Sequence, residues 1–221
     1  MSNNSREDAA TVIGWVGIEK YDIILYLAKL LTCLNKKVLL IDRSENSALT
    51  YCIPIPAIMN ATSNKVNFRN IDFIKERNVS DFINDYDYIL IDFGFKTTHA
   101  DIYKCDKIII VTDKQQHNID TMYTLKSKSE VLLVLKAEGN KREIDALQES
   151  IREQLQIEDI VVMGFDEIDK EKMIMLQYNS EIKVKRLSGQ YIYLLEQIMT
   201  TILKFDSKDF GQAYKQLKRG A

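Results

Sequence analysis

The residues best placed to do chemistry lie between positions 11 and 42, where an apolar run leads into a loop, a lysine and a helical pattern. A phosphate-binding loop reads G-x-x-x-x-G-K-[ST], in which backbone N–H groups, the lysine and a hydroxyl meet phosphates and Mg²⁺. Gly14 and Lys20 fill the first-glycine and lysine positions. Glu19 stands where the second glycine is required, and Tyr21 stands in place of the hydroxyl residue. The spacing predicts the scaffold of a phosphate site whose chemistry is damaged.

Two of these replacements oppose phosphate binding directly. Glu19 adds a Cβ and a negative charge where backbone N–H groups would face the ligand. A carboxylate about 4 Å from a phosphate charge costs on the order of 4 kcal/mol at an effective dielectric constant of about 20. The Tyr21 hydroxyl lies across a ring from the backbone, so it cannot copy the short reach of Ser or Thr to a metal. We expect no resident cofactor or metal, and weak binding of ATP, ADP and Mg²⁺ at most, with Lys20 as the remaining phosphate contact.

Two aspartates follow buried strand patterns. Asp42 ends the run 37–42, and Asp92 ends the strand within YDYILIDFG, residues 86–94. Ligands of open α/β sheets bind at the carboxyl ends of strands, where an aspartate can hold Mg²⁺. Strands also end in aspartate because it favours turns, and for either residue alone both interpretations stay open. With Lys20 ahead of them in the expected order, the pair favours a former nucleotide site.

Alternation of strand and helix patterns predicts the fold. The strand-like runs are continuous in Val, Ile and Leu, as in strands covered on both faces, and the patterns between them have helical spacing. The predicted strands are 11–16, 37–42, 87–92, 107–112, 130–135 and 159–163, and the predicted helices are 20–34, 114–127, 141–156, 169–177 and 188–204. This order predicts an α/β fold with a doubly wound, mainly parallel sheet flanked by helices. Residues 50–80 are less regular and predict an insertion with a helix near 70–77.

Composition and charge set the outer bounds. The chain has 221 residues, 46% of them hydrophobic, and a formal net charge of −2. This charge and the lack of a long basic stripe argue against nucleic-acid binding. Cys33, Cys52 and Cys105 form no CxxC pair and predict reduced thiols of a cytoplasmic protein. We expect a disordered segment at 1–10, one domain over 11–204 and a tail at 205–221.

Five segments together resemble a known family. They are NKKVLLID (35–42), YDYILIDFG (86–94), CDKIIIVTDKQQHNID (105–120), GFDEIDKEKMIMLQYNSEI (164–182) and LSGQYIYLLEQIMTTIL (187–203). In this order and spacing, the chain resembles the ParA/MinD group of P-loop ATPases, the deviant Walker A family, over residues 11–204. The resemblance implies the P-loop NTPase fold, ATP with Mg²⁺ at Asp42 and Asp92, and a nucleotide base near residues 164–182.

The sequence departs from the family pattern at positions that, in the family, contact the nucleotide or position the attacking water. The family's loop lysine that reaches the partner's nucleotide is Trp15 here, and one of the neighbouring glycines is kept as Gly17. The aspartate that helps position the attacking water is Ser44, and the asparagine that contacts the base is Lys136. The pattern therefore indicates vestigial nucleotide-binding positions, at Gly14, Trp15, Gly17, Glu19, Lys20, Tyr21, Asp42, Ser44 and Asp92, and no catalytic residue.

A family pattern that is kept while its catalytic and nucleotide-binding residues are replaced predicts a bacterial pseudo-ATPase. We expect a non-catalytic localisation, assembly or regulatory factor for a cell-envelope, secretion or conjugation, or partition system. The alternative is a slow but active ParA/MinD-like ATPase that uses Lys20, Asp42 and Asp92. The expected partners are other proteins of a larger assembly and a second copy of the chain, because family members pair face to face. Trp15 is either the anchor of that homodimer or a ring that fills the empty site within one subunit.

The tail carries a short amphipathic pattern. Phe210, Ala213, Tyr214 and Leu217 share one helical face, beside the basic residues Lys215, Lys218 and Arg219. Membrane-binding helices of MinD-like relatives have this pattern, which predicts a peripheral position at the inner face of the membrane. The alternatives are a helix that docks on a partner and one that packs back on its own domain.

Overall fold

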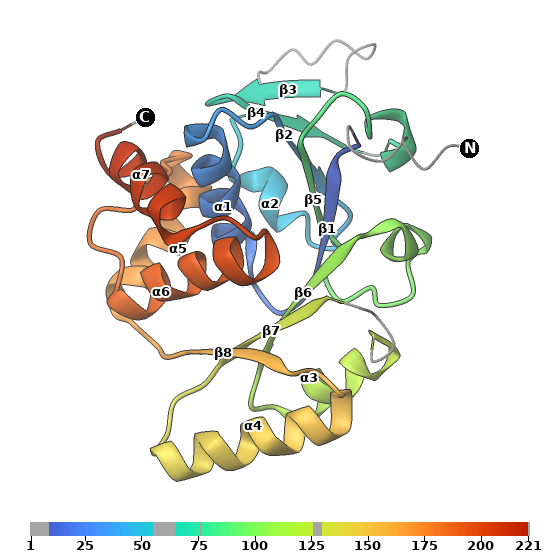
Figure 1. Ribbon diagram of the computed structural model, residues 1–221, viewed down its shortest axis with the longest axis vertical. Coiled ribbons are helices and arrows are strands. Elements are labelled where there is room, and N and C mark those ends of the chain that lie inside the picture. Colours follow the sequence, from blue (N-terminus) through green and yellow to red (C-terminus); the bar gives the residue numbers. More distant parts are fainter. Residues whose placement is uncertain (1–8, 55–64, 76, 126–129, 221) are drawn as a thin grey trace.

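The fold is built on one twisted sheet. The computed structural model describes residues 9–54, 65–75, 77–125 and 130–220. Within them, an eight-stranded sheet has the order β3-β4-β2-β5-β1-β6-β7-β8 (Figure 1). Its strands are β1 (Thr11–Gly17), β2 (Val38–Asp42), β3 (Lys65–Phe68), β4 (Ile71–Ile74), β5 (Tyr88–Asp92), β6 (Lys107–Asp113), β7 (Val131–Lys136) and β8 (Asp159–Met163). Only β3 and β4 pair antiparallel among these strands, so the predicted mainly parallel sheet and its six predicted strands are confirmed.

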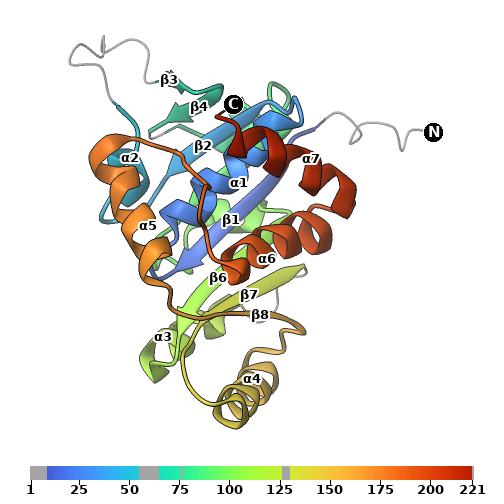
Figure 2. The same ribbon diagram turned by 90° about the vertical axis from the view of Figure 1, so that its left-hand side faces the viewer.

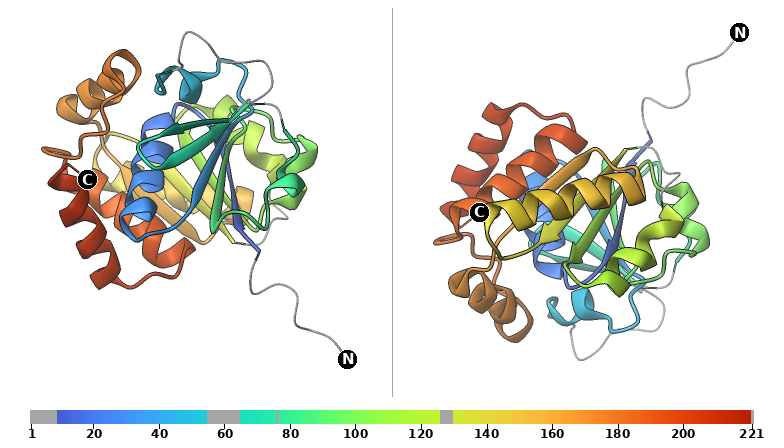
Figure 3. Two further views of the ribbon diagram at one scale, coloured as in Figure 1. Left: turned by 90° about the horizontal axis from the view of Figure 1, so that it is seen from above. Right: turned by 90° about the horizontal axis from the view of Figure 1, so that it is seen from below.

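Helices cover both faces of the sheet. They are α1 (Tyr21–Cys33), α2 (Ala48–Tyr51), α3 (Gln116–Thr121), α4 (Lys141–Leu155), α5 (Glu167–Asn179), α6 (Gly189–Gln197) and α7 (Ser207–Lys218). Single turns are η1 (Val79–Asp81), η2 (Ala100–Lys104), η3 (Met122–Leu125) and the π-turn η4 (Ile198–Ile202). Helices α1, α5, α6 and α7 lie on one face and α3 with η1 and η2 on the other (Figures 2 and 3). None of the helices described here is long and apolar enough to cross a membrane.

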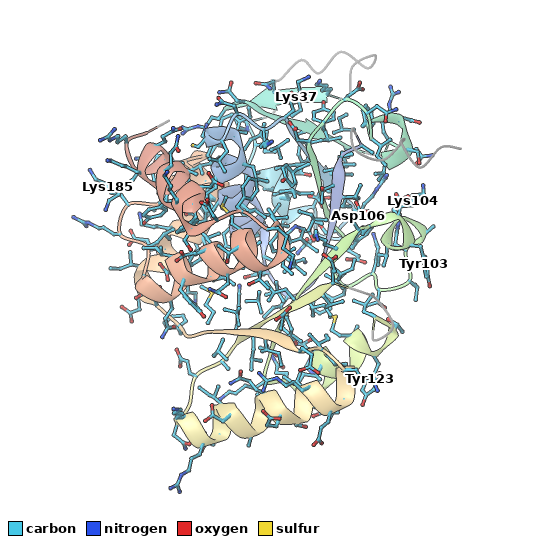
Figure 4. The ribbon with its side chains drawn as sticks, viewed as in Figure 1. Lys37, Tyr103, Lys104, Asp106, Tyr123 and Lys185 are labelled. Carbon is cyan, nitrogen blue, oxygen red and sulfur yellow. The ribbon has the colours of Figure 1, made fainter. Side chains whose placement is uncertain are left out.

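Strand β1 shows why the central strands are apolar throughout. Ile13 and Trp15 enter the hydrophobic core on the α1 face, whereas Val12 and Val16 enter the core on the opposite face. Both faces are therefore buried, and a continuous apolar run is stable here. The Val12 N–H also donates to Asp106 Oδ2 at 2.8 Å, which ties β1 to the start of β6 (Figure 4).

The predicted helix near 70–77 is wrong. The structure has a β3–β4 hairpin instead, in which Phe68 pairs with Ile71. Its two-residue turn consists of Arg69 and Asn70, with φ angles of +52° and +66°. Two consecutive positive φ angles make a type I′ turn, for which Asn-Gly is the usual sequence signal. Because that signal is absent here, the sequence does not predict the turn. Residues 55–64 of the predicted insertion lie outside the described residues.

The other predicted helices are present with shifted ends. The 114–127 pattern begins as α3 and η3, and residues 126 and 127 are outside the described part of the chain. The 188–204 pattern forms α6 followed by the π-turn. Of the segment expected to be disordered, residues 1–8 are also outside the described part. Ala10 is buried, and its N–H donates to the Ile83 carbonyl at 2.7 Å.

Helix α7 packs back on its own domain. Phe210, Ala213 and Leu217 are buried in the core beside α1. The Tyr214 hydroxyl donates to the Val184 carbonyl at 3.4 Å, and its ring stacks on Phe210 with centroids 5.7 Å apart. Of the three alternatives for the tail, packing on its own domain is the one that the structure shows, and the apolar face is covered in the docked helix. Membrane contact stays a prediction, which requires α7 to leave the domain. Lys215, Lys218 and Arg219 remain beside it.

We expect Phe210→Ala to lower the free energy of unfolding by about 3–5 kcal/mol, because it opens a cavity under α7. Lys218→Ala, on the exposed side of the same helix, should change it by less than about 0.5 kcal/mol. Urea unfolding followed by circular dichroism measures both. Unchanged stability of Phe210→Ala, combined with loss of binding to anionic vesicles, would show instead that α7 leaves the domain to meet membranes.

Candidate functional site

The turn between β1 and α1 is short and closed by the protein itself. Only Ile18, Glu19 and Lys20 separate the two elements. The Gly17 N–H donates to the Gly94 carbonyl at 2.7 Å, and the Ile18 N–H donates to the Val111 carbonyl at 2.9 Å. Both N–H groups belong to the stretch that would cradle a phosphate, and both are already paired with backbone.

Gly17 is required by this close approach of two strands. Its φ is +115°, and a Cβ added here would lie 1.9 Å from the Val111 carbonyl oxygen. A residue with a side chain is excluded on both counts. The kept glycine is therefore explained by the packing of β1 on β6, without reference to a nucleotide.

Lys20 is held in a buried ion pair. Its Nζ lies 2.9 Å from Asp92 Oδ1 and donates to the Gly17 carbonyl at 2.9 Å, and the residue is only 3% exposed. Asp92 Oδ1 also accepts the Gly94 N–H at 2.9 Å. The structure thus brings two predicted site residues together, but their charges compensate each other.

Both carboxylate oxygens of Asp42 accept hydrogen bonds from the segment that follows β2. Its Oδ1 accepts the Ser44 N–H at 3.0 Å and the Ser44 hydroxyl at 2.5 Å. Its Oδ2 accepts the Thr50 N–H at 3.0 Å and the Thr50 hydroxyl at 2.9 Å. Asp42 pairs in register with Asp92 across β2 and β5, at the strand ends where both were expected. However, its hydrogen bonds anchor the entry to α2, as the turn-forming interpretation expects.

Tyr21 and Trp15 both point into the protein. The Tyr21 hydroxyl donates to the Met173 carbonyl on α5 at 3.2 Å, and burial raises the pKa of Tyr21 above its ordinary value. Trp15 lies within β1 and is 0% exposed, and its indole N–H has no acceptor among the described residues. Of the two alternatives for Trp15, burial within one subunit is the one that agrees with this arrangement, and its role as a dimer anchor stays an untested prediction.

Two cavities flank the turn. The first, here called the loop cavity, has a volume of about 340 Å³ and lies at the carboxyl ends of β1, β2 and β5. Glu19, Glu45 and Asp92 line it, and Lys20 is the single cation among the described residues that do so. Lys20 neutralises Asp92, and Glu45 Oε1 lies 3.7 Å from Lys96 Nζ, so Glu19 is the one lining carboxylate without an ion pair among the described residues. The Glu19 charge and the engaged Lys20 make this cavity a poor fit for the phosphates of ATP.

The second cavity, here called the α5 cavity, has a volume of about 420 Å³. It lies at the carboxyl ends of β6, β7 and β8 and extends to α5 and α6. Lys136, which replaces the base-contacting asparagine of the resembled family, lines it and donates from Nζ to the Glu19 carbonyl at 2.6 Å. Asp22 and Asp169 also line this cavity, and sequence reasoning missed both as site residues. Their only signal was their place in the first turns of helices.

The side chains of the two strand-end aspartates are occupied by protein contacts. No group of three or more His, Cys, Asp or Glu side chains in the described part of the chain is placed to hold an ion. Together with the hydrogen bonds of Asp42 and the ion pair of Asp92, this arrangement does not fit the Mg²⁺ that the resemblance implies.

Comparison with solved structures identifies the type of fold. No protein-family model and no curated protein matches the sequence. MinD in the MinC:MinD cell division complex of Aquifex aeolicus is similar in structure, with a TM-score of 0.61 and 16% identity over 96% of this chain and 97% of that chain. A ParA family ATPase of Chlorobium tepidum gives a TM-score of 0.59 and 16% identity over 89% and 100% of the two chains.

A third solved structure includes a nucleotide analogue. It is a putative plasmid partition protein of Borrelia burgdorferi bound to AMPPNP, with a TM-score of 0.56 and 18% identity over 88% of this chain and 99% of that chain. At such identities the likeness establishes the fold alone. The chain therefore has the ParA/MinD-type P-loop ATPase fold that its sequence resembles.

Proposed function

We propose that this protein acts without hydrolysing ATP, as a ParA/MinD-like localisation, assembly or regulatory factor that works by binding other proteins. The observation that carries the proposal is the state of Lys20. This phosphate-binding side chain is buried against Asp92 and the Gly17 carbonyl. Turning Lys20 toward a phosphate would leave Asp92 buried without its partner, which is strongly unfavourable.

The other groups around this turn are also poorly suited to catalyse phosphoryl transfer. Catalysis of that reaction depends on positioning and on charges that stabilise the transition state. Here the N–H groups of Gly17 and Ile18 are engaged by carbonyls, and Glu19 and Glu45 line the loop cavity. The alternative, a slow ATPase, requires Lys20 to leave Asp92 and Asp42 to give up its contacts to Thr50.

We expect phosphate release from Mg²⁺-ATP at background rate. The measurement compares wild type with Lys20→Ala, each with Mg²⁺ and with a chelator, after circular dichroism shows that both are folded. Calorimetry should give no binding of ATP or ADP in the low micromolar range, which corresponds to about −8 kcal/mol. Turnover that needs Mg²⁺ and disappears in folded Lys20→Ala would support the ATPase alternative.

A variant that restores two residues of the phosphate-binding motif also tests this proposal, through its affinity for ATP. Glu19→Gly combined with Tyr21→Thr removes the extra carboxylate and restores the motif's hydroxyl. If these residues alone blocked the site, ATP affinity would rise; we expect it to stay weak, because Lys20 remains paired with Asp92 in the variant. The triple variant that adds Asp92→Asn frees Lys20 and serves as the matched comparison. Tight ATP binding by the double variant would contradict the central place given to Lys20.

The partners of this chain are proposed by analogy with its fold. The Aquifex aeolicus MinD structure is a complex with MinC, which supports binding of a protein partner. The proposed client is a cell-envelope, secretion or conjugation, or partition system, and neighbouring genes would identify which. We also propose a homodimer held by direct contacts. Sedimentation with and without ATP tests it: a monomer that dimerises only with ATP would contradict it.

A further inference from the structure

Helix α5 exposes apolar side chains and buries a carboxylate. Four of its apolar residues, here called the α5 surface, are between 40% and 81% exposed: Ile168, Ile174, Met175 and Tyr178. Asp169 of the same helix is buried. A surface helix normally turns its apolar side toward the core and its charged side toward water. Helix α5 reverses that arrangement, which indicates that its outer side meets something other than water.

Helix α4 shows the usual arrangement in the same protein. Its buried residues are Ile151 and Leu155, and it contributes none of the large apolar side chains that are exposed in the described part of the chain. Ten such side chains are exposed there, and four of them belong to α5. Single exposed apolar residues are normal on any protein, whereas their gathering on one element marks an interaction surface.

Hydrogen bonds near both ends of α5 fix its rotation about its own axis. Asp169 Oδ1 accepts the Ser188 N–H at 2.8 Å, just before α6 begins. Gln177 Nε2 donates to the Ala48 carbonyl on α2 at 3.3 Å. Between these contacts, Leu176 is buried in the core. Turning α5 to cover its apolar residues would break both hydrogen bonds and expose Leu176, so the α5 surface points outward in this fold.

The four residues lie on one side of the helix. Met175 and Tyr178 are three positions apart, and Ile174 and Tyr178 are four apart, which makes them neighbours on a helix. Ile168 lies two turns before Met175 on the same side. Tyr51 extends this surface from α2, which contacts α5 and lies beside it (Figure 2). None of these side chains lines the loop cavity or the α5 cavity, so the surface is separate from the nucleotide position.

The exposed area is suited to a protein partner. A fully exposed tyrosine offers roughly 150–250 Å² to a partner. Tyr178 is 81% exposed and Tyr51 is 69% exposed, so these two side chains alone offer on the order of 300 Å². A standard protein–protein interface buries about 800 Å² on each partner. With the Ile and Met side chains added, the surface supplies the apolar centre of such an interface.

The distribution of charge along α5 suits a second copy of the chain. The exposed charges of this helix lie in its N-terminal half, at Glu167, Lys170 and Glu171, whereas residues 173–179 carry no charge. When two copies of α5 cross antiparallel about a two-fold axis near Ile174, the uncharged halves meet. The charged halves then point in opposite directions, so like charges of the two copies stay apart.

We propose that a second copy of this chain binds the α5 surface, with the two α5 helices crossing at Ile174, Met175 and Tyr178 and with Ile168 and Tyr51 at the rim. Tyrosine is enriched among the residues that dominate binding energy at interfaces. This inference rests on the homodimer proposed above and names the contacts that hold it. Because these side chains lie outside both cavities, the dimer forms without a nucleotide.

Sedimentation of the full chain over a range of micromolar concentrations tests the proposal. Wild type should dimerise equally with and without Mg²⁺-ATP. Met175→Lys should weaken the dimer by about a hundredfold or more, because the two-fold axis brings two buried ammonium groups into the contact. Tyr123→Lys is the matched control and should dimerise as wild type does. Tyr123 is 43% exposed, against 40% for Met175, and lies on η3 across the sheet from α5 (Figure 4).

The outcomes separate this surface from the homodimer itself. A wild type that stays monomeric at every concentration would overturn both. A Met175→Lys protein that dimerises as tightly as wild type would overturn the α5 surface and leave the homodimer standing. Equal weakening by Tyr123→Lys would also overturn the assignment, because the effect would then not depend on α5. Circular dichroism checks that both variants are folded.

A measurement on wild type alone covers the case in which a variant does not fold. In protein with ¹³C-methyl methionine, the Met175 resonance should move on dilution in step with the fraction of dimer from sedimentation. Met199 is buried in the core and should not move. A protein that dimerises while its Met175 resonance stays fixed would overturn the proposed location.

Discussion

Lys20→Met is expected to lower the free energy of unfolding by about 3–5 kcal/mol, because it leaves Asp92 as a buried charge without its partner. Asp92 is 3% exposed, so water cannot replace the lost ammonium. In a working nucleotide loop the corresponding lysine serves the ligand, and its loss affects binding first. Here its loss should affect the fold first. Urea unfolding at pH 7, followed by circular dichroism, measures the change.

The double variant Lys20→Met with Asp92→Asn separates an unpaired charge from lost packing. The amide that replaces the Asp92 carboxylate is neutral, and its carbonyl oxygen can still accept the Gly94 N–H that Asp92 accepts now. We expect the double variant to recover most of the stability, since replacing both members of a buried ion pair is often nearly neutral. If the double variant is as unstable as Lys20→Met, the ion pair is not what holds Lys20 in the structure.

The sheet was predictable because strands that are buried on both faces leave a recognisable apolar run in the sequence. Parallel strands covered on both faces must be apolar throughout, and β1, β2 and β5 to β8 all have such runs. The β3–β4 hairpin was not predictable in the same way. Strand β3 lies at the edge of the sheet and alternates between exposed and half-buried residues, and the Arg69–Asn70 turn lacks the usual glycine.

The site was predictable in its positions but not in its contacts. Gly17, Lys20 and Asp92 stand where a nucleotide loop would have them, and the structure brings them together. The same residue types also serve a close strand contact and a buried ion pair, and no sequence pattern separates these uses. Asp22 and Asp169 were missed because they approach one cavity from α1 and α5, which are far apart in the sequence.

Gly17→Ala is expected to destabilise the fold by at least about 3 kcal/mol, or to prevent folding. The added Cβ would lie 1.9 Å from the Val111 carbonyl oxygen, at a φ of +115° that alanine rarely adopts. Relief requires β1 to move away from β6, which breaks the hydrogen bond from Ile18 to Val111 and disturbs the central pair of strands. Thermal and urea unfolding measure the loss.

Gly211→Ala is the matched control for this substitution. Gly211 lies inside α7, where an added Cβ meets nothing within 4 Å, so alanine should stabilise the helix by about 0.5–1 kcal/mol. Opposite signs from the same chemical change would show that Gly17 is kept for backbone geometry. A folded Gly17→Ala protein with wild-type stability would mean that the strands can separate at this point. The turn would then be free to open for a phosphate, and the pairing of the Gly17 and Ile18 N–H groups with carbonyls would no longer argue against a working loop.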